Sequence, residues 1–286
     1  MKIYSSAPIS GTEAILGEGP LWNVKEQKLY WVDIDGKQLH VYDPKSKTDR
    51  AFDTPGRIGV AAFCKDGRIL CAVEDTLMFM KFQNASYEAD GVLAKVSEVM
   101  PGMRFNDGEC DPRGRFLVGS IAGDKKGHLF SVDSTGMYQI LLDGIGCSNG
   151  IAFSCDGKKM YYIDTVSSHV TSYDYCLDTG KISAKKIIRT FAWETDGAPD
   201  GMTIDTKGNL WVAHWGGSRV SCINPEDGEI IASIPVTAKC VTSAAFGGPE
   251  LKTIYITSAK ADGGIHAGGL FAADADVSGN APYLFG

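Results

Sequence analysis

The chain has 286 residues, of which 44% are hydrophobic and 22% are charged, a composition typical of a globular protein and not of a disordered or fibrous one. Its 28 basic and 35 acidic residues leave a formal net charge of -7, which disfavours a nucleic-acid partner. No apolar run reaches the roughly 18 residues of a membrane span, and the start of the chain lacks a secretory leader. We therefore expect a cytoplasmic protein with no nucleic-acid or membrane partner.

The chain contains eight cysteines but no CxxC pair, and most of the eight lie in apolar runs. Small buried thiols suit this pattern better than a disulfide or zinc framework does. No Pro/Ser-rich linker or block of charge divides the sequence, so we predict one domain over residues 1–286.

A turn rich in Asp, Gly and Lys, followed by an alternating apolar strand, recurs six times along the chain. The repeat has a period of 40 to 50 residues, with strand centres at Tyr30, Leu70, Leu117, Tyr161, Trp211 and Tyr255. A second short strand and another turn follow each centre, so each unit is rich in hairpins. Helical periodicity is scarce, and only stretches such as Tyr87 to Met100 are ambiguous.

Six modules of about four strands at this period predict an all-β fold, a six-bladed β-propeller. A large β-sandwich or two small barrels are the alternatives, but neither explains a six-fold period. To close the ring without exposed edges, we expect the segment around Lys2 to Ser6 to supply an outer strand to a terminal blade.

Polar residues recur at one phase of the repeat, eleven or twelve positions before the strand centre. Four repeats carry a carboxylate or carboxamide there, followed within two residues by glycine: Glu18, Asn106, Asn149 and Asp200. A propeller brings this phase to one rim of its central channel, so we expect the four side chains to converge. Asp and Asn before Gly are also ordinary turn formers, but that explanation is weaker for four positions in phase.

Two carboxylates and two amides that meet in a channel of low dielectric need a cation between them. Because all the candidate donors are oxygens, one hard divalent ion is expected. Calcium fits best, with magnesium, manganese and, less readily, zinc as the alternatives.

Two further motifs are interpreted as accidental. Gly146 to Gly150 matches the G-x-S-x-G nucleophile elbow, but the residues that follow read as strand, turn and strand where that motif requires a helix. Asp33 to Gly36 resembles the opening of an EF-hand loop, but Pro44 stands where the loop needs Glu, so a hairpin turn is expected. His214 and Trp215 end an inner strand and are candidates to line the channel.

The order of the motifs resembles the SMP-30/gluconolactonase/luciferin-regenerating-enzyme family, which includes regucalcin. The resemblance covers essentially the whole chain, through GEGPLWN, LYWVDIDGKQLHVYDP, MRFNDGECDPRGRFLVGS, SNGIAFSCDGKKMYYIDT, GAPDGMTIDTKGNLWVAHWGG and TSAAFGGPELKTIYITSA. It implies a six-bladed propeller with one divalent metal ion in the channel, and many members of the family hydrolyse sugar lactones.

Carried over by motif, the resemblance implies metal ligands at Glu18, Asn149 and Asp200, and substrate-holding residues at Arg104 and Asn106. It departs after Ser120, where animal members have an acidic stretch and a longer loop, which leaves the sugar preference open.

The implied reaction is the opening of a sugar lactone to the aldonic acid, with the metal polarising the carbonyl and Asp200 as general base. A related metal-dependent esterase or phosphotriesterase, and a non-enzymatic calcium-binding propeller, are the alternatives.

Overall fold

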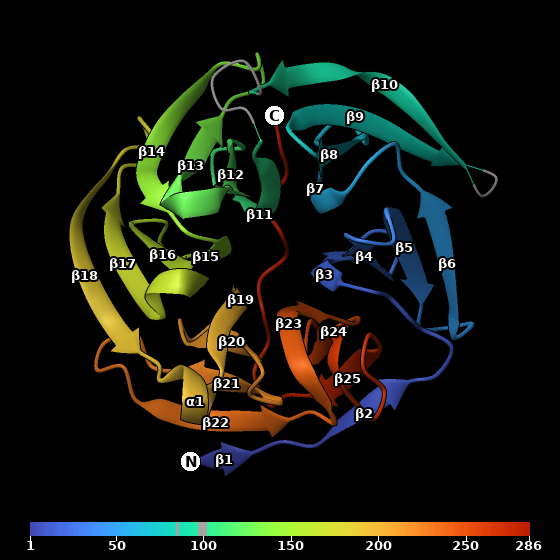
Figure 1. Cartoon of the computed structure of the whole chain (residues 1–286), viewed down its shortest axis with the longest axis vertical. Coiled ribbons are helices and arrows are strands. Elements are labelled where there is room, and N and C mark those ends of the chain that lie inside the picture. The colour runs from blue at the N-terminus through green and yellow to red at the C-terminus, as the bar shows by residue number, and fades with distance from the viewer. Residues whose placement is uncertain (84–85, 97–101) are drawn as a thin grey trace.

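Six β-sheets radiate around a central axis in a computed structural model, which describes residues 1–83, 86–96 and 102–286 (Figure 1). The predicted six-bladed β-propeller is therefore confirmed. Within each blade, neighbouring strands of the four-stranded meander pair antiparallel, so the chain passes outward from the channel to the rim and returns to the axis at the next blade.

The first three blades follow one another along the chain, each from its innermost to its outermost strand. Blade 1 contains β3 (Gly17–Asn23), β4 (Lys28–Asp33), β5 (Gln38–Asp43) and β6 (Thr48–Asp53). Blade 2 contains β7 (Ile58–Phe63), β8 (Ile69–Val73), β9 (Thr76–Gln83) and β10 (Ser86–Lys95). Blade 3 contains β11 (Arg104–Cys110), β12 (Phe116–Ile121), β13 (Gly127–Val132) and β14 (Tyr138–Ile145).

The remaining blades continue the same order. Blade 4 contains β15 (Ser148–Phe153), β16 (Lys159–Asp164), β17 (His169–Tyr175) and β18 (Ile182–Thr190). Blade 5 contains β19 (Ala198–Ile204), β20 (Leu210–Trp215), β21 (Arg219–Ile223) and β22 (Ile230–Pro235). Blade 6 contains β23 (Ala238–Gly247), β24 (Thr253–Gly264) and β25 (Leu270–Asp274).

The N-terminal residues complete two blades, not one. β2 (Ser6–Ile9) pairs antiparallel with β25 and is the outer strand of blade 6, so the first and last parts of the chain close the ring together. β1 (Lys2–Ile3) pairs parallel with β22 and adds a fifth strand to blade 5. The expected outer strand thus begins at Ser6, later than the sequence indicated.

The helices described are all short. They are η1 (Gly123–Lys125), η2 (Thr165–Ser167) and α1 (Trp193–Asp196). The stretch from Tyr87 that was ambiguous in sequence forms most of β10, and positions 97 to 100 lie outside the described residues. In the described part of the chain, no helix has the length and apolar character to cross a membrane.

The core consists of six apolar clusters, one between each pair of adjacent blades. Trp211 and Phe246, for example, pack edge to face with ring centroids 5.9 Å apart between blades 5 and 6. Between blades 6 and 1, Trp22 stacks on Tyr255 at 5.6 Å. Each cluster joins residues of two blades, so burial of apolar surface holds the blades together around the ring.

Each innermost strand carries a register shift at the phase where the polar residues recur. The six shifts begin after Glu18, Ile58, Phe105, Asn149, Pro199 and Val241. A β-bulge turns side chains away from the strict alternation of a strand. The register shift that recurs in each innermost strand therefore directs these side chains toward the axis.

Glycine beside the bulges lets the innermost strands approach one another closely. A Cβ on Gly150 would lie 2.9 Å from the carbonyl oxygen of Asp200, and one on Gly201 would lie 2.5 Å from the Cβ of Ser243. Any larger residue would push neighbouring blades apart at the axis. The same close approach occurs at Gly59, whose Cβ would lie 2.5 Å from the carbonyl oxygen of Asn106.

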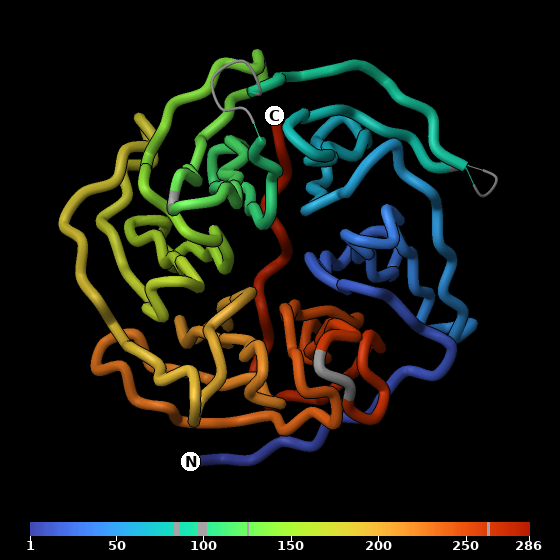
Figure 2. The backbone as a smooth tube through the Cα atoms, viewed as in Figure 1, coloured from blue at the N-terminus to red at the C-terminus, as the bar shows by residue number. Residues whose placement is uncertain are grey.

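The last nine residues, 278–286, form what we call the C-terminal strap, which crosses the axis on one face of the ring (Figure 2). It begins on blade 5, where Thr206 N donates to Ser278 O at 2.9 Å. It ends on blades 2 and 3, where Phe285 N donates to Phe63 O and Gly286 N donates to Gly114 O, both at 2.9 Å. The strap therefore ties opposite sides of the propeller together.

Two neighbouring strap residues allow the contribution of this tie to be measured. Phe285 is 3% exposed and packs 6.2 Å from the Phe79 ring, whereas Leu284 is 40% exposed. We expect Phe285→Ala to lower the free energy of unfolding in urea by about 3 kcal/mol, since it leaves a cavity in a packed core. Leu284→Ala, the matched control, is expected to cost less than about 1 kcal/mol. Equal effects of the two substitutions would show that the strap is not docked.

Candidate functional site

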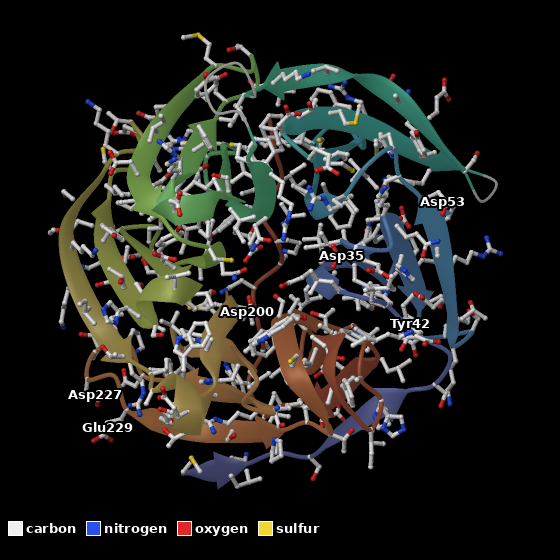
Figure 3. All side chains as sticks on the ribbon, in the orientation of Figure 1. Asp35, Tyr42, Asp53, Asp200, Asp227 and Glu229 are labelled. Carbon is white, nitrogen blue, oxygen red and sulfur yellow. The ribbon has the colours of Figure 1, made fainter. Side chains whose placement is uncertain are left out.

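The four polar residues singled out by the repeat all lie on innermost strands. Glu18 is on β3, Asn106 on β11, Asn149 on β15 and Asp200 on β19, and each is buried. Figure 3 shows Asp200 close to the axis, in contrast to Asp53 at the rim. The structure thus brings together side chains that are up to 182 positions apart in sequence (200 minus 18).

Hydrogen bonds join three blades at the axis. Arg104 Nη1 donates to Asn106 Oδ1 at 2.6 Å, and Asn106 Nδ2 donates to Asn149 Oδ1 at 3.0 Å. Asn149 Nδ2 in turn donates to Thr165 Oγ1, which donates to Pro199 O, each at 2.8 Å. This network fixes the rotamers of both amides and points the Asn149 oxygen toward Asn106.

The two carboxylates of the set have few partners. Glu18 Oε2 accepts from Gly19 N at 3.1 Å, and no other hydrogen bond to Glu18 or to the Asp200 carboxylate is found among the described residues. Burial, together with the charge of Asp107, raises the pKa of Glu18 to about 8. Burial and the charge of Glu18 raise the pKa of Asp200 well above its usual value. Without a cation, both groups are costly to ionise.

Two further carboxyl groups, which sequence analysis missed, lie in the same channel. Asp107 and Glu109 line a cavity of about 60 Å³ enclosed by the innermost strands. Burial raises the pKa of Asp107 to about 6, and burial together with the charge of Asp107 raises that of Glu109 to about 8. The bulge in β11 spans Asn106 and Asp107, so both side chains reach the axis where strict alternation would have turned one away.

The donor set suits a hard divalent cation. Its oxygens belong to carboxylates and carboxamides, which are the ligands that such ions prefer. Asn149 Oδ1 accepts one hydrogen bond, from Asn106, and keeps a second lone pair for an ion. In the described ranges no three His, Cys, Asp or Glu side chains form a metal site by themselves, so the Asn149 amide is needed to complete the set. Residues Glu18, Asn149 and Asp200 could therefore hold one ion, which would relieve the repulsion between the two carboxylates.

Other candidates from the sequence have structural roles. Ser148, the serine of the G-x-S-x-G match, lies in β15 and accepts a hydrogen bond from Tyr162 OH at 2.8 Å. It is therefore not at the strand-to-helix turn that a nucleophile elbow requires. His214 is buried edge-on against Phe191 with ring centroids 4.7 Å apart, and burial lowers its pKa to about 3.

None of the eight cysteines forms a disulfide, as expected, and five of them are buried. Asp33 accepts Gly36 N at 2.9 Å in a hairpin turn.

The chain after Ser120 is as short as the sequence indicated. β12 ends at Ile121, the turn η1 covers Gly123–Lys125, and β13 starts at Gly127.

Fold and site together define a class: six-bladed propellers with acidic and carboxamide side chains at the axis. The profile of the SMP-30/Gluconolactonase/LRE-like region matches residues 16–260. The chain belongs to this family.

Several relatives align over nearly the whole chain. YvrE of Bacillus subtilis, whose name assigns it provisionally to the sugar lactone lactonases, is 37% identical over 284 residues, 96% of each chain. The pentonolactonase XacC of Haloferax volcanii is 36% identical over 90% of this chain and 86% of its own. The structure of regucalcin from Agrobacterium tumefaciens, described as a calcium-binding protein, superposes with a TM-score of 0.91 at 25% identity, covering 100% of this chain and 99% of that one.

From the buried carboxylates we predict that a divalent cation stabilises the protein, and that this stabilisation is larger at high pH than at low pH. Because the pKa of Glu18 lies near 8 and that of Asp200 is raised, protons compete with the cation at pH 5. At pH 8 we expect saturating calcium to raise the Tm of chelator-treated protein by about 5 °C, and at pH 5 by much less. Asp200→Asn should lose this shift and Asp53→Asn, on the outer strand β6, should keep it. An unchanged Tm at pH 8 with calcium, magnesium, manganese and zinc would contradict the site.

For Glu109 we predict a second pH effect, on the free energy of unfolding of the metal-free protein. Its pKa is raised to about 8 in the folded protein, so between pH 5 and 8 the folded state keeps a proton that the unfolded state has lost, and stability falls as pH rises. We expect Glu109→Gln to be more stable than the wild type by about 2 kcal/mol at pH 9 and nearly equal to it at pH 5 in urea unfolding. A difference independent of pH would show that this carboxyl is not buried.

Proposed function

We propose that this lactonase opens a sugar lactone to the aldonic acid with the help of one divalent cation held by Glu18, Asn149 and Asp200. The observation that carries the proposal is the pair of buried carboxylates, Glu18 and Asp200, that converge beside an oriented carboxamide at the axis. When bound, the cation would supply Lewis-acid stabilisation of the negative charge that develops on the lactone carbonyl oxygen.

Asp200 acts as the general base in this proposal. It takes a proton from the attacking water, whose oxygen bonds to the carbonyl carbon. The ring C–O bond then breaks, and Asp200 returns the proton to the ring oxygen. Burial and the neighbouring carboxylates raise the pKa of Asp200 in the metal-free protein. A bound cation would lower this pKa again, so that the carboxylate is ionised and can accept the proton. No donor among the described residues competes for its oxygens.

Arg104 and Asn106 hold the substrate. The Arg104 guanidinium is fixed by Asn106 Oδ1 at 2.6 Å and by Phe105 O at 3.0 Å, both through Nη1, which leaves its other donors for hydroxyl or ring oxygens of a lactone. Asn106 Oδ1 keeps a second lone pair that can accept from a substrate hydroxyl. Both residues start β11, one blade away from Asn149, so they lie beside the proposed cation.

Calcium is the ion we propose first, with magnesium, manganese or zinc as alternatives. The donors are hard oxygens, and the regucalcin from Agrobacterium tumefaciens is described as a calcium-binding protein. That description also favours a second candidate function, calcium binding without catalysis. Cysteines without disulfides support a reducing compartment such as the cytoplasm.

The test is pH-stat hydrolysis of a panel of aldonolactones by chelator-treated protein refilled with one cation at a time. We expect turnover that depends on the added ion. No turnover with any of the four cations, despite a calcium-dependent rise in Tm, would favour the second function over the first.

Asp200→Ala tests the general base in the same assay. We expect kcat to fall by about 100-fold or more, since positioned proton transfer contributes at least this factor. Circular dichroism should show an unchanged fold, and Asp53→Ala at the rim serves as the control. A variant that keeps more than about a tenth of the activity when loaded with metal would exclude this role.

A further inference from the structure

We propose that the indole of Trp193 forms the wall of a substrate subsite that packs against the carbon substituent of the lactone. This inference rests on the proposed lactonase function and adds a residue that decides which lactones are preferred. Its starting point is exposure: Trp193 is 50% exposed, although a large aromatic side chain is normally mostly covered.

The indole is held in place and is not a loosely exposed side chain. Its Nε1 donates a hydrogen bond to the Ser168 hydroxyl. The helix that carries it, α1, is fixed at both ends, because Phe191 before it is buried in the core between blades 4 and 5 and Asp196 accepts from Arg219 Nη2 at 2.9 Å. A tryptophan immobilised in this way keeps its apolar face in contact with water, which costs free energy unless a ligand covers it.

The turn that accepts the hydrogen bond from Trp193 also contacts Asn149, one of the proposed cation ligands. Ser168 follows η2 directly, and η2 begins with Thr165, whose hydroxyl accepts from Asn149 and donates to Pro199, the neighbour of Asp200. Because a 3₁₀ turn rises only about 2 Å per residue, Ser168 lies within about one turn of Thr165. Trp193 is therefore connected to the blade 4 and blade 5 part of the site through this one turn and its hydrogen bonds.

The turn that holds Trp193 carries one exposed apolar side chain of its own. Val166, two residues before Ser168, is 45% exposed and lies against Gly146, next to the start of β15. On the other side of the site, Arg104 offers donors. A lactone whose carbonyl is at the axis would thus meet hydrogen-bond donors on one side and an aromatic face on the other.

An aromatic face suits the C–H bonds of a substituted carbon chain. The face of an indole is the negative part of its quadrupole and a large apolar surface, so it attracts C–H groups that carry slight positive charge. Glucono-δ-lactone carries a carbon substituent on its ring, whereas δ-valerolactone carries none. Trp193 should therefore matter for the first substrate and not for the second.

The experiment compares wild type, Trp193→Ala, Trp193→Phe and Ile187→Ala on both lactones with the metal-loaded enzyme. Ile187, 49% exposed on the outer strand β18, is the matched control. We expect Trp193→Ala to lower kcat/KM for glucono-δ-lactone about fivefold, mainly through KM, and to leave δ-valerolactone within about twofold. Trp193→Phe should keep most of the activity, and Ile187→Ala should keep all of it.

Calorimetric titration with gluconate provides a readout that does not need turnover, with an expected loss of affinity of about fivefold in Trp193→Ala. Equal losses on both lactones, or gluconate affinity equal to that of the wild type, would overturn the subsite. A wild type that hydrolyses neither lactone would overturn the proposed function instead, and gluconate binding would still decide the role of Trp193.

Discussion

The repulsion between two buried carboxylates governs the centre of this propeller. Glu18 and Asp200 lie in an environment that disfavours their charged forms, and few hydrogen-bond donors reach them. Two such carboxyl groups are stable together when they bind protons or when they share a cation. A cation would allow both carboxylates to stay ionised at neutral pH. Glycine and the bulges in the six innermost strands make this arrangement sterically attainable, since they let the blades approach at the axis.

The proposed metal and substrate sites are linked through side chains. The chain of hydrogen bonds from Arg104 through Asn106 and Asn149 to Thr165 crosses blades 3 and 4 and ends on Pro199 of blade 5. A change in either amide of this chain would alter both the position of the Asn149 oxygen proposed as a ligand and the orientation of the Arg104 guanidinium. Effects of substitutions in this network are therefore expected to be non-additive.

The fold and part of the site could be predicted because both follow from the repeat. A period of 40 to 50 residues places Glu18, Asn106, Asn149 and Asp200 at equivalent points of separate blades, and each point is an innermost strand. Asp107 was missed because period-two alternation turns it away from the axis, and only the bulge in β11 reverses this.

Features that depend on contacts between distant segments could not be predicted. The parallel pairing of Lys2–Ile3 with blade 5 is one example, because a segment of two residues is too short to show a periodic hydrophobic pattern. The same holds for the strap, whose residues fit no repeat unit. The role proposed for Trp193 depends on a hydrogen bond to Ser168, which the sequence does not reveal.

The strap also obstructs one face of the ring. Pro282 and Tyr283 line a pocket together with Glu109, and the backbone of the strap runs across the axis (Figures 1 and 2). We therefore expect lactone to enter, and the acid to leave, through the opposite face.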